Sequence, residues 1–294
     1  MILDKKLKLA NGVEIPVLGL GTWCIDDNKV AEVVRQAIKI GYRHIDTAEA
    51  YGNERGVGEG IRTCGIPREE IFLQTKLHAE AKTYEDAKRE IELSFEKLGV
   101  DYIDLLIIHS PQPWDSFRDG NHYFEGNLQA WKALTEYYKA GKIKAIGVSN
   151  FEEIDIDNLI ENSDMKPMVN QILTHISNTQ FSLINYCQEN GIVVEAYSTI
   201  AHGELLKNKT IQEIAQKYKV SVAQLCVRYT LQLGLVSLPK ASSPQHMKEN
   251  ADVDFEISAE DMKKLMEIDK IHDYGQFSFF PVFSGKIKEE KWKN

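Results

Sequence analysis

The chain has 294 residues, of which 43% are hydrophobic and 27% charged, and its formal net charge is −9 at pH 7. This is the composition of an ordinary globular protein, and it excludes collagen-like, low-complexity and intrinsically disordered chains. An acidic surface repels phosphate backbones and anionic lipids, so we expect neither nucleic acid nor a membrane as a partner.

The sequence also predicts where the protein resides. No apolar run is long enough to span a bilayer, and the first ten residues, MILDKKLKLA, lack the apolar core of a signal peptide. The four cysteines are far apart and form no Cys-x-x-Cys pair: Cys24, Cys64, Cys187 and Cys226. They could form disulfides, but without a secretion signal reduced thiols are favoured. We therefore expect a cytoplasmic protein.

Short apolar, β-branched runs alternate with longer helical patterns along the whole chain. Some of these runs, such as LLII and IVV, are continuously apolar, which is typical of parallel strands covered on both faces. The eight strand-like runs are Val17–Leu20, His44–Thr47, Ile71–Thr75, Ile103–His109, Lys144–Val148, Met168–Ile172, Val193–Tyr197 and Val236–Leu238.

Amphipathic helices are predicted between these runs. Residues 83–98 and 127–140 each place apolar side chains on one face and end near a glycine. Capping boxes predict further helix starts at four pairs: Thr83 with Asp86, Thr210 with Glu213, Ser221 with Gln224, and Ser258 with Asp261. The segment between the last two strand-like runs holds two helical patterns, so one helix there is additional to the repeat.

Strand–helix alternation repeated eight times predicts a closed (β/α)8 TIM barrel, with an open doubly wound sheet as the alternative. No linker divides the chain, so we expect one domain over residues 1–294. Residues 1–18 are predicted to form a β-hairpin around Asn11-Gly12. Residues 273–294 carry six aromatic side chains without helical periodicity. We expect them to cover the barrel mouth as a substrate loop; a frayed end is the alternative.

Such a barrel places its active site at the carboxyl ends of the strands. Asp46 ends the second predicted strand, Tyr51 lies in the loop beyond it, Lys76 follows the third strand, and His109 ends the fourth. An ammonium beside a phenol lowers the pKa of the phenol, and a carboxylate keeps that ammonium charged. An imidazole could hold a carbonyl oxygen. The set suits protonation of an alkoxide as hydride arrives at carbon, and it lacks the activated Ser or Cys of hydrolases.

At these residues the sequence resembles the aldo-keto reductase family, in its bacterial aldehyde and ketone reductase type. The GVSNF and HIDTAEAYGNE motifs are highly specific, and the resemblance covers essentially the whole chain. The matching stretches, in family order, are GLGTW (19–23), YRHIDTAEAYGNE (42–54), QTKL (74–77), DLLIIH (104–109), KIKAIGVSNF (142–151), VNQI (169–172), EAYS (195–198) and LPKASSPQHMKEN (238–250).

The resemblance implies an NAD(P)H-dependent oxidoreductase that interconverts carbonyl compounds and alcohols. Its catalytic tetrad would be Asp46, Tyr51, Lys76 and His109, with Tyr51 as the general acid for reduction. The implied cofactor is NADP(H), with NAD(H) as a second candidate, bound across the mouth without a Rossmann fold. Its predicted contacts are Gly21, Thr22, Trp23, Asp46, Ser149, Asn150, Gln171, Tyr197, Ser198, Lys240, Ser243, His246, Glu249 and Asn250.

The family pattern assigns roles within this set. Ser149, Asn150 and Gln171 would hold the nicotinamide carboxamide, and Tyr197 would stack on the nicotinamide ring. Lys240 would meet the adenosine phosphate, together with Ser243.

The sequence departs from the family pattern around the adenosine phosphate. The family usually has Arg six residues after the lysine, where this chain has His246, and commonly Ser directly after it, where this chain has Ala241. An imidazole cannot replace a bidentate guanidinium on a 2′-phosphate. We therefore predict a weaker preference for NADPH over NADH than in relatives with the arginine.

The predicted substrate pocket comprises Trp23, His78, His109, Ser110 and Trp114. The insertion around Trp114 and the aromatic tail are predicted to complete its wall, and Ser110 replaces a common family tryptophan. No residues have the number and spacing that predict a metal site. The expected partner is a small carbonyl compound, and the family favours a monomer.

Three other function classes are compatible with parts of this pattern. A Schiff-base lyase would use Lys76 as nucleophile, but Asp46 beside it keeps the amine charged. A metal-dependent hydrolase using His44 and Asp46 lacks further ligands. The main alternative is a non-enzymatic NADP(H)-binding redox-sensing module on the same fold, which the four retained catalytic residue types disfavour.

Overall fold

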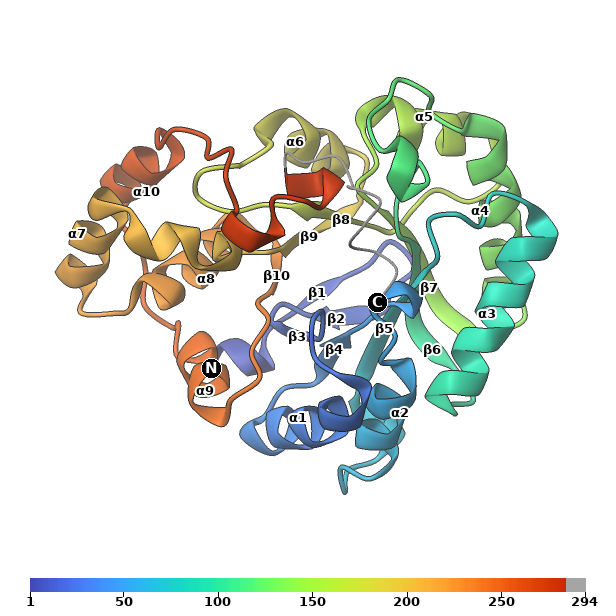
Figure 1. Ribbon diagram of the computed structural model, residues 1–294, viewed down its shortest axis with the longest axis horizontal. Helices are drawn as coiled ribbons and strands as arrows, with labels where there is room; N and C mark the ends of the chain where they lie inside the picture. Colours follow the sequence, from blue (N-terminus) through green and yellow to red (C-terminus); the bar gives the residue numbers. More distant parts are fainter. Residues whose placement is uncertain (284–294) are drawn as a thin grey trace.

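The computed structural model describes residues 1–283, and a ring of eight parallel strands lies at its centre (Figure 1). Each strand pairs with the next one along the chain. The strands are β3 (Gly19–Gly21), β4 (His44–Asp46), β5 (Phe72–Leu77), β6 (Ile103–Ile108), β7 (Ile143–Ser149), β8 (Val169–Leu173), β9 (Val193–Tyr197) and β10 (Val236–Leu238). All eight predicted runs overlap these strands.

The ring closes between its first and last strands. Ser237 N donates to Val17 O at 2.8 Å, and Gly21 N donates to Pro239 O at 3.1 Å. Two parallel bridges join the same segments. An open doubly wound sheet would leave these two edges unpaired, so that alternative is wrong and the predicted (β/α)8 barrel is confirmed.

Helices surround the barrel and cover the outward faces of its strands (Figure 1). Helices cover the outward face of each strand and the barrel interior covers the other, so the strands are almost entirely buried. The helices are α1 (Asp27–Ile40), α2 (Glu54–Arg62), α3 (Tyr84–Leu98), α4 (Phe124–Lys139), α5 (Glu153–Asn162), α6 (Phe181–Glu189), α7 (Lys209–Tyr218), α8 (Val222–Gln232), α9 (Pro244–Ala251) and α10 (Ala259–Met266). Within residues 1–283, no helix has the length and apolar character needed to cross a membrane.

The predicted helices agree closely with those observed. Helices α3 and α4 correspond to the patterns at 83–98 and 127–140, and α7 and α8 together supply the additional helix between β9 and β10. Ser221 and Gln224 form the complete capping box expected at α8. The prediction for Thr210 is wrong, because Asn208 begins α7 earlier by accepting from Ile211 N at 3.1 Å. Asn is at least as good an N-cap as Thr.

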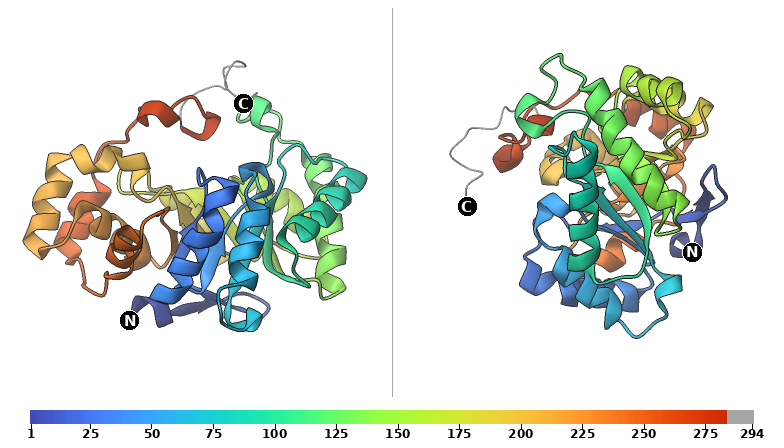
Figure 2. Two further views of the ribbon diagram at one scale, coloured as in Figure 1. Left: turned by 60° about the horizontal axis from the view of Figure 1, so that its bottom comes forward. Right: turned by 90° about the vertical axis from the view of Figure 1, so that its right-hand side faces the viewer.

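Separate segments cover the two ends of the barrel (Figure 2). The predicted hairpin is confirmed as β1 (Lys6–Lys8) and β2 (Glu14–Pro16), which close one end, and Asn11 Oδ1 stabilises its turn by accepting from Val13 N at 3.1 Å. The aromatic segment that contains η6 (Gly275–Phe277) and η7 (Pro281–Phe283) lies over the opposite end. The remainder of the predicted 273–294 loop, including Trp292, lies outside the described residues.

Helices α2 and α3 approach closely at Gly58. A Cβ atom at this position would lie 1.9 Å from the carbonyl oxygen of Leu98, the last residue of α3. The obstacle is backbone and cannot rotate away, so any larger residue must push the two helices apart. Packing therefore requires glycine here, although glycine weakens a helix.

We predict that Gly58→Ala lowers the free energy of unfolding by about 1–3 kcal/mol, the usual cost of overpacking. Urea denaturation measures this loss. Glu59→Ala, at an exposed position of the same helix, is the control and should change stability by less than about 0.5 kcal/mol. A Gly58→Ala variant as stable as the parent would show that the helices can separate at no cost.

Candidate active site

The four residues predicted to act together meet at the carboxyl ends of β4, β5 and β6. Lys76 Nζ on β5 lies 2.6 Å from Asp46 Oδ1 at the end of β4. It also lies 3.2 Å from Oη of Tyr51, in the short helix η2 (Glu49–Tyr51). His109 follows β6, and its ring centroid is 5.7 Å from that of Tyr51. The parallel order of these strands brings residues distant in sequence to one rim.

The Lys76 ammonium has no free donor. It is fully buried, and its three hydrogens match its three bonds, to Asp46 Oδ1, Tyr51 Oη and, at 2.9 Å, the carbonyl oxygen of Thr47. A buried charge is tolerated when it is paired and hydrogen-bonded in this way. Lys76 is therefore held as a charged donor toward Tyr51 and not as a free nucleophilic amine.

Burial sets the protonation of two further groups. It raises the pKa of the Tyr51 hydroxyl well above its ordinary value, and the Asp46 carboxylate adds to this rise. The net direction is opposite to the lowering predicted for a phenol beside an ammonium, because loss of water dominates. Tyr51 is thus a protonated donor at neutral pH. Burial, with the nearby Lys76 and His78, lowers the pKa of His109 well below its usual range, so its imidazole is neutral.

Two cavities open above these residues and share Trp23, Tyr51 and Tyr197 in their walls. The larger has an empty volume of about 1460 Å³ and extends from Tyr51 to Lys240 and beyond. The smaller, of about 490 Å³, has a mainly aromatic and amide wall. That wall consists of Trp23, Ala50, Tyr51, His109, Trp114, Ser149, Asn150, Gln171, Tyr197, Phe280, Val282 and Phe283.

Most of the predicted cofactor contacts line these cavities. Ser149, Asn150 and Gln171 line the smaller one. Thr22 and Ser243 line neither cavity formed by residues 1–283: Thr22 donates to the carbonyl oxygen of Asp46 at 2.9 Å, and Ser243 caps α9. The larger cavity is lined by Gly21, Trp23, Asp46, Tyr197, Ser198, Lys240, His246, Glu249 and Asn250, among others.

Two predicted substrate contacts lie outside the cavity walls that the described residues form. His78 sits between Glu49 and Glu80, and its hydrogen bond to Glu80 raises the pKa of His78. Ser110 is fully buried, and its carbonyl oxygen accepts from Lys82 Nζ at 2.9 Å. Both residues therefore have intramolecular partners in place of a substrate, whereas Trp23, His109 and Trp114 line the smaller cavity as predicted.

Comparison with known proteins agrees with this geometry. A model of the aldo/keto reductase family matches residues 17–270. The chain belongs to this family. Over 270 residues it is 44% identical to glyoxal reductase of Bacillus subtilis (strain 168), and the match covers 91% of this chain and 94% of that relative. The family resemblance seen in the sequence is thus confirmed.

Solved structures of aldo-keto reductases are similar throughout. The enzyme from Brucella melitensis has a TM-score of 0.82 and 38% identity, and the match covers 90% of this chain and 99% of that one. A Bombyx mori aldo-keto reductase in complex with NADP also has a TM-score of 0.82, with 32% identity over 96% of this chain and 99% of that one.

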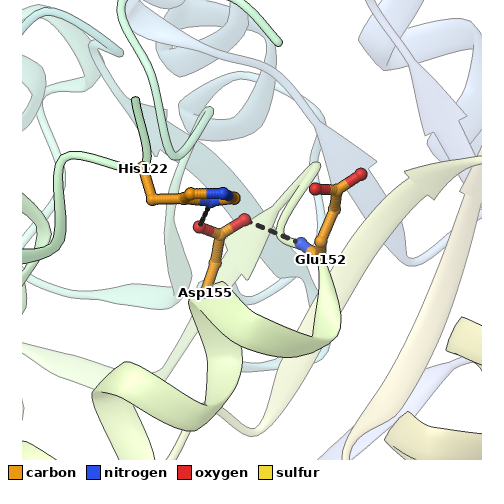
Figure 3. A group of neighbouring side chains, drawn as sticks. All are labelled: His122, Glu152 and Asp155. Carbon is orange, nitrogen blue, oxygen red and sulfur yellow. Dashed lines mark hydrogen bonds and ion pairs between the residues drawn. The ribbon is translucent and has the colours of Figure 1, made fainter. Parts of the chain in front are cut away.

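In this aldo-keto reductase, the insertion after β6 brings Trp114 to the smaller cavity. An ion pair and a hydrogen bond hold this insertion in place. Arg118 Nη1 lies 2.6 Å from Glu152 Oε1. His122 Nδ1 lies 2.7 Å from Asp155 Oδ1 (Figure 3). Both acids lie at the start of α5. The wall of the cavity is therefore attached to the helix that follows β7.

His122 and the two acids at the start of α5 have the spacing of a possible cation site. Ligand atoms of His122, Glu152 and Asp155 lie within 4.8 Å of one another (Figure 3). These atoms already have partners, since Asp155 Oδ2 accepts from Glu152 N at 3.0 Å while its Oδ1 contacts His122, and Glu152 binds Arg118. We interpret the cluster as an anchor of the insertion.

His202 lines the larger cavity and is not among the residues predicted from the sequence. Its ring stacks on Phe277 with centroids 4.1 Å apart, and its Nε2 lies 3.2 Å from Ser198 Oγ. The residue has a φ of 54°, in the left-handed region that non-glycine residues rarely adopt. No regular pattern in the sequence reports such a conformation. Its position soon after Ser198, a predicted contact, was the available signal.

We predict that Lys76→Met lowers the free energy of unfolding by about 3–5 kcal/mol, because it leaves the buried Asp46 carboxylate unpaired. Denaturant unfolding measures the loss, and the double variant Lys76→Met/Asp46→Leu should recover part of it. Lys97→Met is the control: Lys97 is half-buried, keeps contact with solvent and pairs with Glu49 at 2.8 Å, so its loss should cost less than about 1 kcal/mol. Equal losses in both single variants would mean that the buried pair has no special role.

Proposed function

We propose that this protein reduces an aldehyde or ketone to the alcohol with NADPH or NADH, and that Tyr51 is the general acid. The observation that carries this proposal is the position of the Tyr51 hydroxyl. It is protonated, bonded to the Lys76 ammonium at 3.2 Å, and lies where the two cavities meet. A group so placed can deliver a proton to an oxygen held in the smaller cavity.

The larger cavity fits an extended dinucleotide. Where the smaller cavity joins it near the tetrad, the amides of Asn150 and Gln171 in the wall of the smaller cavity offer polar groups to a nicotinamide carboxamide. Toward the other end, Lys240 offers a cation and His246 an imidazole to a phosphate. The NADP complex of the Bombyx mori relative supports this choice of cofactor. When bound, the cofactor supplies a hydride to the carbonyl carbon.

The residues of the chain handle the oxygen and its proton. The neutral His109 can donate an N–H bond to the carbonyl oxygen and so fix its position. As negative charge develops on that oxygen, Tyr51 transfers its proton to it and becomes a phenolate. Lys76 at 3.2 Å stabilises the phenolate, and a proton from solvent then restores Tyr51. The carbonyl thus gains one hydride and one proton.

The wall of the smaller cavity indicates what it accepts. Trp23, Trp114 and Phe280 give it a largely aromatic surface, which favours a compact, uncharged carbonyl compound. The similarity to glyoxal reductase of Bacillus subtilis supports a small aldehyde as the first compound to assay.

We predict that Tyr51→Phe lowers kcat by roughly 10² or more, the scale expected for loss of a general acid, and leaves cofactor affinity nearly unchanged. The assay follows loss of NADPH absorbance at 340 nm with a small aldehyde, and fluorescence titration gives the cofactor Kd. Tyr137→Phe, which removes a surface hydroxyl bonded to Glu92, is the matched control. Full turnover by Tyr51→Phe would refute the role of Tyr51, and a wild-type protein that binds NADPH without turnover would favour the redox-sensing alternative.

A second prediction concerns the choice between the two cofactors. Because His246 stands where relatives have arginine, the ratio of kcat/KM for NADPH over NADH should be well below a thousandfold. His246→Arg should raise this ratio by about tenfold or more through a charge-assisted bond to the 2′-phosphate. Gln245→Arg adds the same charge one residue away, at an exposed position, and should change the ratio little. A wild-type protein with about a thousandfold NADPH preference would contradict the prediction.

A further inference from the structure

We propose that Glu195 is a positioning residue that turns the side-chain amide of Gln171 so that its oxygen faces the smaller cavity. The inference rests on the proposed function, in which this cavity adjoins the nicotinamide of the cofactor. It concerns a residue inside the barrel, below the tetrad, that the proposed mechanism does not use.

Glu195 lies within the barrel wall and is fully buried. Its Oε2 accepts two amide hydrogen bonds, from Gln171 Nε2 at 2.9 Å and from Gln74 Nε2 at 2.6 Å. Gln171 and Glu195 are register partners on the neighbouring parallel strands β8 and β9. The backbone pairing thus fixes the distance between the carboxylate and the Gln171 amide.

The two hydrogens of the Gln171 amide are both used inside the protein. One goes to Glu195, and the other goes to Asp46 Oδ1 at 3.1 Å, the same oxygen that binds Lys76. An amide nitrogen has two hydrogens, so only the Gln171 oxygen remains to face a ligand. A nicotinamide carboxamide presents N–H donors, and the Gln171 oxygen would accept one of them.

Burial of the Glu195 carboxylate costs free energy, and packing alone does not explain why a carboxylate occupies this position. Barrel interiors are usually filled by branched apolar side chains, and burial raises the pKa of Glu195, which marks the penalty for its charge. In the described residues Glu195 Oε1 has no hydrogen-bond partner, and its nearest cation candidate, His44 Nε2, is 3.7 Å away. Glu195 thus satisfies an N–H donor of each of the two amides, although one of its own oxygens has no hydrogen-bond partner among the described residues.

The test is a double-mutant cycle on cofactor affinity, with the NADPH Kd measured by fluorescence titration. Glu195→Leu removes the acceptor and should weaken NADPH binding about five- to tenfold, the scale of one charged hydrogen bond. Glu195→Gln keeps an amide oxygen that can accept from Gln171, so affinity should return to within about threefold of wild type. In a Gln171→Leu background, Glu195→Leu should change Kd by less than about twofold, since its target is gone.

A merely structural role gives a different pattern. If Glu195 only supports the barrel, Glu195→Leu and Gln171→Leu lower NADPH affinity independently and their effects multiply, which overturns the proposal. Wild-type NADPH affinity in Glu195→Leu overturns it as well. If Glu195→Leu does not fold, Glu195→Thr replaces it in the cycle with the same expected values, because its hydroxyl is too short to reach Gln171 and threonine suits a strand.

Two controls separate this inference from the proposed function. Glu54→Gln alters another buried carboxylate, which accepts from Thr75 at 2.6 Å outside this network, and it should leave the NADPH Kd unchanged. A wild-type protein that neither binds NADPH nor reduces carbonyl compounds overturns the proposed function. A wild-type protein that does both, but whose cycle shows independent effects, overturns the role of Glu195 alone.

Discussion

The backbone hydrogen bonds between β3 and β10 hold the barrel closed, and every functional side chain depends on that closure. Two glycines permit it. A Cβ at Gly19 would lie 2.6 Å from Leu238 Cδ2, and one at Gly21 would lie 3.3 Å from the carbonyl oxygen of Leu238. A closed ring carries the carboxyl ends of all its strands to one rim, where the chain collects its polar residues.

Exclusion of water at that rim determines the protonation states of Tyr51 and His109. The same burial that keeps Tyr51 protonated keeps His109 neutral. In the proposed reaction, a phenol with a raised pKa is a weak acid toward a neutral carbonyl group, and it becomes an effective one only as charge develops on the substrate oxygen. Its interactions thus strengthen along the reaction, which is the condition for lowering a barrier. The paired charge of Lys76 is already in place to receive the resulting phenolate.

The regular parts of this molecule could be predicted because they depend on patterns local in sequence. Continuous apolar runs indicate buried strands, strand ends locate Asp46, Lys76 and His109, and an Asn-Gly pair indicates a hairpin. Features that depend on three-dimensional neighbours could not be predicted. The pKa of Tyr51 is raised mainly by the removal of water, and the extent of that removal depends on packing.

The differences between the predicted pocket residues and the cavity walls have the same origin. His78 is a predicted wall residue, but Glu49 of η2 and Glu80 of its own loop hold it outside the cavity walls. The family pattern places Ser110 in the pocket wall, but its surroundings depend on Lys82, which is distant in sequence. The place of His202 in the wall depends on an unusual backbone conformation that no sequence pattern reports. Sequence position identifies the rim, whereas packing decides which side chains face inward.

The anchor between the insertion after β6 and the start of α5 has a consequence for how substrate range can change. Arg118 and His122 tie the segment that carries Trp114 to Glu152 and Asp155, which follow Asn150 closely in the chain. An exchange of the aromatic ring at position 114 reshapes the pocket and leaves the tie intact. A transplanted insertion of another length has to bring its own partners for Glu152 and Asp155, or it loosens the segment after β7 that carries Asn150. Exchange of the ring at position 114 therefore disturbs the structure less than a change in the length of the insertion does.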